Sequence, residues 1–322
     1  SPAPPPTASI PWESGDWSVL RDSLLRTGTW VADHGITGSG GFQSARDLLL
    51  RERPHVPLEG LGTLIGEDGR LTEAAKPLVH SLFRQASVLP IQGPPGSGKT
   101  FTGARMIVEL VKQGRRVGVT AGSHKVISTL LREVFVAATD SAVSLKAVQK
   151  ATDGDECRHP AVTKAKDNQA ILDALITGAA KVAGGSPWLW AAEEMASSVD
   201  VLFVDEAAQM SLANVLAASQ AATSIVLLGD PQQLDQPQRG VHPPGAEVSA
   251  LAHLLNGHAT IAADQGLCLS ETRRLHPDTT ACTADPFYEG RLVEGPVRPA
   301  PPAQRASPSG GEGRASVPRR RP

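Results

Sequence analysis

The sequence predicts an α/β protein built on a doubly wound parallel sheet. Runs at residues 87–91, 201–204 and 225–228 are almost entirely apolar, as is usual for strands that are covered on both faces. Apolar residues recur at helical spacing over residues 99–113 and 125–135, between these runs. A glycine-rich loop joins the first run to the first helical segment. Strands and helices that alternate in this way are typical of parallel sheets with helices on both faces.

Composition divides the chain into four segments. Residues 1–11 form a proline-rich linker, and residues 12–70 carry tryptophans and leucines at roughly helical spacing, which predicts an accessory helical segment. Residues 71–294 hold the alternating strands and helices, and a polar stretch at about residues 137–185 is interpreted as an insertion. Residues 295–322 have little apolar surface to bury, so this tail, like the linker, is predicted to be disordered.

The overall composition excludes few functions. The 31 basic and 33 acidic residues give a formal net charge of −2, which neither favours nor excludes a nucleic-acid partner. No apolar run is long enough to span a membrane, and we expect no membrane partner. The three cysteines lack the spacing of metal ligands, and the CxH pair of Cys157 and His159 supplies only two of the ligands that zinc requires. We therefore expect reduced thiols and a cytoplasmic location.

The glycine-rich loop predicts a site for ATP and Mg²⁺. Residues 93–100 read GPPGSGKT and match the phosphate-loop pattern G-x-x-x-x-G-K-[ST] between a predicted strand and a predicted helix. The glycines allow backbone N–H groups to face phosphate oxygens, and the start of the helix adds positive potential. Lys99 would bind the outer phosphates and Thr100 would bind Mg²⁺. The alternative is a flexible loop without a ligand. The predicted nucleotide-binding residues are Gly93, Pro94, Pro95, Gly96, Ser97, Gly98, Lys99 and Thr100.

Two acidic residues at the end of a second strand would complete this site. The stretch VLFVDEAAQ places Asp205 and Glu206 directly after an apolar run. Asp205 would hold Mg²⁺, and Glu206 would orient and deprotonate the attacking water. The alternative is an acidic pair at the N-terminus of a helix, where negative charge is stabilising in any protein.

A third polar stretch, GDPQQL, follows the run at residues 225–228. Because that run would form a neighbouring strand and the polar stretch its exit loop, we expect Asp230 and Gln233 to lie near the nucleotide. A hydrogen bond that Gln233 makes only when the terminal phosphate is present would report the state of the nucleotide. The alternative is an ordinary polar turn.

The motifs GPPGSGKT, DEAAQ, GDPQQL and ETRRLHP occur in the order found in superfamily 1 helicases, and the sequence resembles the DEAxQ branch that serves DNA replication and RNA surveillance. The residues of these motifs most resemble those of bacterial proteins that fuse a RecB-like nuclease to such a helicase. The resemblance spans residues 71–292 and implies a RecA-like ATPase lobe over residues 71–294. A nuclease module would lie upstream, because the first 70 residues contain no acidic cluster with a nearby lysine.

The resemblance also implies residues for nucleic-acid binding and for catalysis. In VTAGSHKVISTLL, Ser123 and His124 would lie along a single-stranded nucleic acid, and DNA is the expected partner. The stretch GGSPWLW would line the same track, with Trp188 and Trp190 as stacking platforms. Arg274 aligns with an arginine that stabilises charge on the transferred phosphoryl group; without the resemblance it would be interpreted as part of an exposed basic pair. The predicted catalytic residues are Lys99, Glu206, Gln233 and Arg274.

The chain departs from the family pattern after residue 292. These motors have two RecA-like lobes, whereas this sequence passes into its low-complexity tail. Since the chain also begins without methionine, we expect a piece of a longer protein, truncated or altered by a shifted reading frame. Two interpretations stay open: the motor lobe of a DNA helicase or translocase, and a module that binds ATP and Mg²⁺ with little turnover of its own. A different phosphate-loop enzyme, such as a AAA-type ATPase or a kinase, is disfavoured by GDPQQL and RRLHP.

Overall fold

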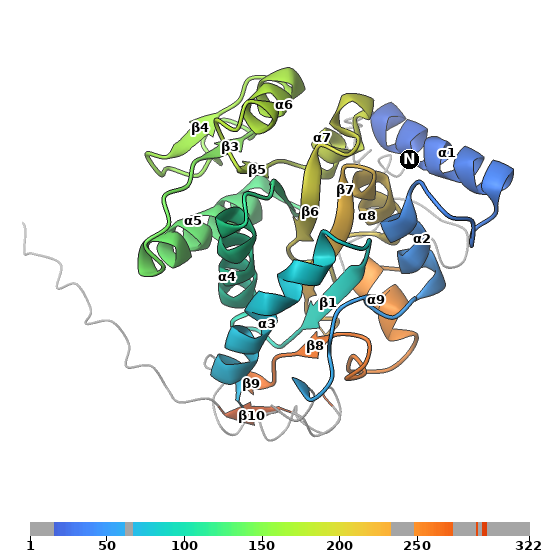
Figure 1. The fold of residues 1–322 in the computed structure, drawn as a ribbon, viewed down its shortest axis with the longest axis vertical. Coiled ribbons are helices and arrows are strands. Elements are labelled where there is room, and N and C mark those ends of the chain that lie inside the picture. Colours follow the sequence, from blue (N-terminus) through green and yellow to red (C-terminus); the bar gives the residue numbers. More distant parts are fainter. Residues whose placement is uncertain (1–15, 62–66, 233–247, 273–287, 289–291, 295–322) are drawn as a thin grey trace, which may run out of the picture.

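The fold is organised around one eight-stranded parallel sheet with the strand order β4-β3-β5-β2-β6-β7-β1-β8 (Figure 1). The structure is a computed structural model that describes residues 16–61, 67–232, 248–272, 288 and 292–294. The predicted α/β fold with a parallel sheet is confirmed, since every strand pair within this sheet is parallel. The strands are β1 (Val88–Gln92), β2 (Val117–Thr120), β3 (Ala147–Gln149), β4 (Val162–Lys164), β5 (Val182–Gly184), β6 (Val199–Val204), β7 (Ala222–Gly229) and β8 (Leu267–Cys268). A separate parallel pair joins β9 (Glu271–Thr272) to β10 (Val293–Glu294).

Helices cover both faces of the sheet, as Figure 1 shows. One face packs against α3 (Asp68–Leu82), α4 (Lys99–Lys112) and α5 (His124–Asp140). The opposite face packs against α2 (Gln43–Leu50), α6 (Asn168–Ile176) and α8 (Leu212–Ser219). The remaining helices are α1 (Ser18–His34), α7 (Pro187–Ala191) and α9 (Ala250–Leu255), with a 3₁₀ turn at Glu193–Met195. Each helix in the described residues is too short or too polar to cross a lipid bilayer.

The continuous apolar runs arise because successive side chains of a strand enter opposite layers of the core. In β6, Val201 and Phe203 pack toward α4 and α5, whereas Leu202 and Val204 pack toward α8. All four side chains are fully buried, and burial of such a side chain contributes roughly 1.5–3 kcal/mol. A strand covered on both faces therefore has no polar position in its middle.

The helices of the predicted accessory segment pack directly on the sheet layers. The α1 helix lies against α7 and α8, where the Ser23 hydroxyl donates to the carbonyl of Ala217 at 2.7 Å. Arg26 donates to the side chain of Gln220 and to the carbonyl of Ala191. The α2 helix contacts β1 and β7 and buries Leu48 completely. In the described residues, these helices thus form part of the layer on one face of the sheet.

The polar stretch at residues 137–185 differs from the predicted insertion, because it supplies three strands of the main sheet. Strands β3, β4 and β5 all lie in it, and β5 pairs with β2. Each of the three has only three residues, and β4 is VTK, so no apolar run marks them in the sequence. These short strands are held in place by backbone hydrogen bonds to the neighbouring strands of the sheet.

Candidate functional site

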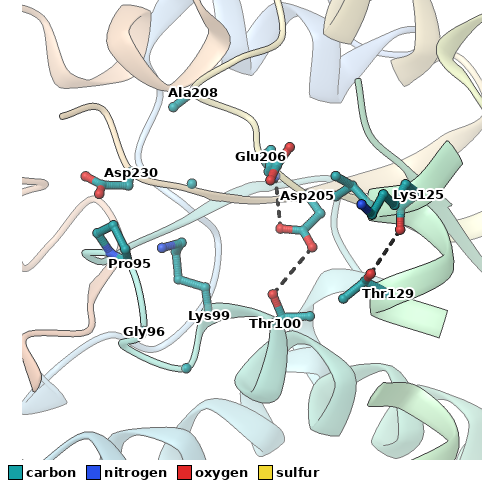
Figure 2. A pocket seen from close by; sticks show the side chains of 13 residues that line it. Pro95, Gly96, Lys99, Thr100, Lys125, Thr129, Asp205, Glu206, Ala208 and Asp230 are labelled. Atoms are coloured by element: carbon teal, nitrogen blue, oxygen red, sulfur yellow. Dashed lines mark hydrogen bonds between the residues drawn. The ribbon is translucent and has the colours of Figure 1, made fainter. Parts of the chain in front are cut away.

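A cavity of about 450 Å³ opens where β1, β6 and β7 end at the same edge of the sheet (Figure 2). This is the edge at which open parallel sheets bind their ligands. The glycine-rich loop and the start of α4 form one side, and residues that follow β6 and β7 form the other. Its lining comprises Pro95, Gly96, Gly98, Lys99, Thr100, Lys125, Val126, Thr129, Asp205, Glu206, Ala208, Gly229 and Asp230.

The glycine-rich loop has a backbone that larger residues would disturb. A Cβ on Gly93 would lie 2.3 Å from the Ser97 hydroxyl and 2.9 Å from the carbonyl oxygen of Leu269. Gly96 and Gly98 have φ angles of +81° and +90°, in the left-handed region that favours glycine. Pro94 accepts a hydrogen bond from the Ser97 backbone N–H at 3.2 Å. The loop therefore forms a tight turn. Within the described residues, the buried Ser97 hydroxyl has no hydrogen-bond partner.

Lys99 begins α4 and reaches back across this loop. Its ammonium group donates to the carbonyls of Gly93 at 2.6 Å and Pro94 at 3.0 Å. In Figure 2 the ammonium group points to the side of the cavity where Pro95 and Asp230 lie. A lysine and the N-terminal end of a fourteen-residue helix both favour an anion here. The donors of the loop thus fit the phosphates of a nucleotide.

The opposite side of the cavity is acidic. The Thr100 hydroxyl faces Oδ2 of Asp205 at 3.5 Å, and the Glu206 backbone N–H donates to Oδ1 of Asp205 at 2.9 Å. Burial raises the pKa of Asp205 to about 6, although the backbone N–H of Glu206 opposes this shift. Burial also raises the pKa of Glu206, whereas the charge of Lys99 lowers it. Carboxylate and hydroxyl oxygens are the ligands that Mg²⁺ prefers, so Thr100 and Asp205 fit a magnesium ion.

Glu206 has an unusual backbone for a non-glycine residue. Its φ of +52° lies in the left-handed region, which is sparsely populated for residues with a Cβ. Glu206 follows the last residue of β6 by two positions, and its half-buried side chain lines the cavity beside Asp205 (Figure 2). The predicted pair of Asp205 and Glu206 therefore lies across the cavity from Lys99 and Thr100.

Asp230 reaches the cavity from the end of β7. Its side chain is 2 % exposed, and burial raises its pKa while the charge of Lys99 lowers it. Gly229 before it packs so closely that a Cβ would lie 2.9 Å from the backbone nitrogen of Ala208. Asp230 thus lines the cavity from the exit loop of β7, and its place near a nucleotide stays a prediction. Gln233 and Arg274 lie outside the described residues, and their roles also stay predictions.

Three lining residues, Lys125, Val126 and Thr129, come from α5 and were not predicted. Lys125 and Thr129 are one helical turn apart, and the Thr129 hydroxyl donates to the carbonyl of Lys125 at 3.0 Å (Figure 2). Their i, i+4 spacing on the polar side of a predicted helix was the only signal in the sequence. Tyr288 was also missed: its hydroxyl contacts the carboxylate of Asp230 across 58 positions of the sequence.

Ser123 and His124 lie directly before this cavity wall, at the start of α5. Ser123 is exposed and caps the helix, accepting a hydrogen bond from the backbone N–H of Val126 at 3.3 Å. His124 is half-buried, and burial lowers its pKa. Among the described residues, its buried Nδ1 has no hydrogen-bond partner. The predicted role of both residues at a nucleic acid stays a prediction.

Both tryptophans expected to stack on bases take part in packing, and Trp190 is inaccessible to a base. The Trp190 side chain is fully buried, and its Nε1 donates to the carbonyls of Val119 and Gly185, so no base can reach it. Trp188 is half-buried, donates to the carbonyl of Asp16 at 3.0 Å, and packs on Trp17 with ring centroids 5.1 Å apart. The prediction that Trp190 stacks on bases is therefore wrong. The stacking role of Trp188 stays a prediction.

The chain is similar to known proteins over part of their length. The chain is 28% identical over 253 residues to the regulator of nonsense transcripts 1 homolog of Drosophila melanogaster, an alignment that covers 67% of this chain and 21% of that protein. It is 32% identical over 96 residues to the DNA-binding protein SMUBP-2 of Rattus norvegicus, which covers 30% of this chain and 10% of that protein. The chain thus spans about a fifth of the length of the first relative and about a tenth of the second.

Among solved structures, the complex of Arterivirus nonstructural protein 10 (helicase) with DNA is similar, at 16% identity and a TM-score of 0.40, over 68% of this chain and 43% of that chain. A family model described as an AAA domain matches residues 71–255. The matched residues include the whole lining of the cavity described above and strands β1 to β7. Since they make up more than half of the sequence, this chain belongs to the AAA domain family.

Proposed function

We propose that this chain is the ATP-binding and hydrolysing motor lobe of a superfamily 1 helicase or translocase that acts on single-stranded nucleic acid, with DNA as the expected strand. One observation carries the proposal: Lys99 and Thr100 face Asp205 and Glu206 across one cavity. Phosphate binding and water activation need these groups at opposite sides of a single site.

ATP would lie with its phosphates on the glycine-rich loop. Backbone N–H groups of the loop and the Lys99 ammonium group would hold the phosphate oxygens. Mg²⁺ bound by Thr100 and Asp205 would neutralise part of the phosphate charge. Glu206 would accept a proton from water, because its raised pKa brings a carboxylate closer to the range of a general base.

The motif order supports the finer parts of the proposal. Asp205–Gln209 match DEAxQ, and GDPQQL and ETRRLHP follow in the helicase order. We propose that Gln233 senses the terminal phosphate and that Arg274 stabilises the transferred phosphoryl group. The AAA domain description fits either a helicase lobe or another AAA-type ATPase. The similarity to a regulator of nonsense transcripts favours the helicase lobe of the RNA-surveillance branch. We also propose a nuclease module upstream, because the residues of these motifs resemble those of bacterial fusions of a RecB-like nuclease to a helicase.

Single-stranded nucleic acid would run past the start of α5. Ser123 and His124 lie beside Lys125, which lines the nucleotide cavity. This proximity would allow a strand to influence the bound nucleotide. The name of the second relative, a DNA-binding protein, supports DNA as the partner.

A second candidate is a module that binds ATP and Mg²⁺ with little turnover. In the part of the chain that the structure describes, the cavity lining contains two lysines and no arginine. An arginine at the phosphates is often what raises turnover in such enzymes. We therefore propose slow hydrolysis by this chain alone and brisk hydrolysis only when further residues, such as those of a second lobe, complete the site.

ATP hydrolysis should be measured with increasing single-stranded DNA for the wild type, Glu206→Gln and Glu109→Gln. Glu206→Gln keeps the shape of the side chain but cannot accept a proton, so nucleotide binding should persist while hydrolysis is lost. Glu109→Gln is the matched control, because Glu109 pairs with Lys112 on α4 outside the cavity lining. Hydrolysis in Glu206→Gln at the wild-type rate would contradict the assigned base. Brisk, DNA-stimulated turnover of the wild type would remove the second candidate.

A further inference from the structure

Tyr288 contacts Asp230, a residue of the nucleotide cavity, from a distant part of the sequence. Its hydroxyl lies 3.2 Å from Oδ1 and 3.1 Å from Oδ2 of Asp230. Both side chains are buried, with 6 % of Tyr288 and 2 % of Asp230 exposed. Tyr288 is the only tyrosine in the sequence and lies outside the motifs GPPGSGKT, DEAAQ, GDPQQL and ETRRLHP.

The tyrosine is the donor in this contact. Burial and the neighbouring Asp230 charge raise the pKa of the Tyr288 hydroxyl, so it keeps its proton. Asp230 accepts a second hydrogen bond at Oδ1 from the backbone N–H of Gln232 at 3.1 Å. Two donors therefore fix the orientation of a buried carboxylate that lines the cavity.

Lys99 acts on Asp230 through its charge, which lowers the Asp230 pKa. Figure 2 shows the Lys99 ammonium group on the side of the cavity where Asp230 lies. A buried carboxylate that loses a hydrogen-bond donor is destabilised, so it interacts more strongly with any other positive group within reach. Without the Tyr288 hydroxyl, Asp230 would compete with phosphate oxygens for Lys99.

A second hydrogen bond ties the same part of the chain to the site. The Thr272 hydroxyl donates to the carbonyl of Pro95 in the glycine-rich loop at 3.1 Å. Thr272 belongs to β9, which pairs with β10 (Val293–Glu294) beyond Tyr288. The contacts of Thr272 and Tyr288 thus connect the chain after β8 to both sides of the cavity.

We propose that Tyr288 is a positioning residue of the nucleotide site, which orients Asp230 so that Lys99 stays available to phosphate and which couples occupancy of the cavity to the chain after β8. This inference rests on the proposed ATP site. It assigns to Tyr288 a role in nucleotide affinity, although the tyrosine itself does not line the cavity.

The single tyrosine offers a direct test. Growth with 3-fluorotyrosine labels the full chain at Tyr288 alone, so the protein has one ¹⁹F resonance. Addition of Mg²⁺ and a non-hydrolysable ATP analogue should shift this resonance, with the same dissociation constant that a fluorescent ATP analogue reports. The shift should be largely lost in Asp230→Asn. A resonance that does not move while the nucleotide is bound would overturn the inference.

A double-mutant cycle tests the route through Asp230. Tyr288→Phe removes one oxygen and should weaken binding of the fluorescent analogue about tenfold, as expected for a lost hydrogen bond to a charged group. In the Asp230→Asn background the same change should alter affinity less than about twofold, because the amide does not attract Lys99. Equal losses in both backgrounds would show a merely structural role and overturn the proposal.

Failure of the proposed function looks different in these experiments. A wild-type chain that binds no nucleotide by fluorescence would remove the ATP site itself. Should Tyr288→Phe not fold, the ¹⁹F titration of the wild type still decides the inference.

Discussion

The nucleotide cavity and the neighbouring region around Trp188 and Trp190 are built in opposite ways, although both follow strands of the same sheet. In the cavity, polar groups are buried with few hydrogen-bond partners. Burial raises the pKa of Asp205. Within the described residues, the Ser97 hydroxyl has no hydrogen-bond partner. Around the tryptophans, both indole N–H groups are satisfied by backbone carbonyls and both rings are packed. Unsatisfied buried polar groups mark a site prepared for a ligand, whereas satisfied ones mark a packed core.

Replacing Trp190 should have the largest effect on stability. The side chain is fully buried and packs over Gly118, where a Cβ would lie 3.0 Å from its ring. Trp190→Ala should lower the free energy of unfolding by about 3–5 kcal/mol, as is usual for a large aromatic residue in a core. Urea unfolding followed by circular dichroism measures this.

Trp188→Ala is the matched control for the same region. The ring is half-buried, so the loss should be about 1 kcal/mol. A tenfold loss of single-stranded DNA binding in Trp188→Ala, at unchanged stability, would support the predicted stacking role and weaken the contrast between the two regions.

In the nucleotide cavity, removing the Lys99 ammonium group should have the next largest effect, which is a loss of nucleotide affinity. Lys99→Ala should weaken binding of a fluorescent ATP analogue about 100-fold, since a charge-assisted contact to phosphate is lost from a partly buried site. The measurement is fluorescence anisotropy at fixed Mg²⁺.

Lys112→Ala serves as the comparison for Lys99→Ala. Lys112 ends the same helix and pairs with the exposed side of Glu109, away from the cavity. Its replacement should leave nucleotide affinity unchanged. Equal losses in both variants would mean that the helix, and not the ammonium group, holds the nucleotide.

The contrast also explains what could be predicted from the sequence. The glycine-rich loop and the acidic pair are local patterns next to long apolar strands, so β1, β6 and β7 were predicted within a few residues of their observed ends. Short-range rules cover this region because each ligand-facing residue follows its own strand directly.

Other parts depend on contacts that no local pattern records. Helix α3 contains Pro77, which by itself argues against a helix at that position. Strand β3 ends at the fully buried Gln149, whose side chain is satisfied by Ser128 and by the backbone N–H of Cys157. Tyr288 reaches Asp230 only through the tertiary fold. These features were missed because burial and pairing override intrinsic preference.

The acidic side of the cavity predicts a pH dependence opposite to that of most carboxylates. Asp205 has an ordinary pKa of 3.8 when unfolded and about 6 when folded, so the folded state binds more protons between these values. The Asp205 contribution therefore lowers the free energy of unfolding as pH rises from about 4 to about 6, by at most about 3 kcal/mol. In the protein without nucleotide, the buried charge of Asp205 therefore destabilises the fold at neutral pH.

Comparison of the wild type with Asp205→Asn isolates this contribution. Asp205→Asn should be more stable than the wild type by about 1–3 kcal/mol at pH 7, and the difference should vanish near pH 4. His124 and His253, whose pKa values burial lowers, destabilise both proteins alike at low pH and cancel in the difference. Urea unfolding between pH 4 and 7.5, without nucleotide or Mg²⁺, gives the two curves. If the difference in free energy of unfolding between the two proteins does not change with pH, the Asp205 charge is already compensated by other groups in the nucleotide-free protein. The cavity would then be no better prepared for a cation than the packed region around the tryptophans.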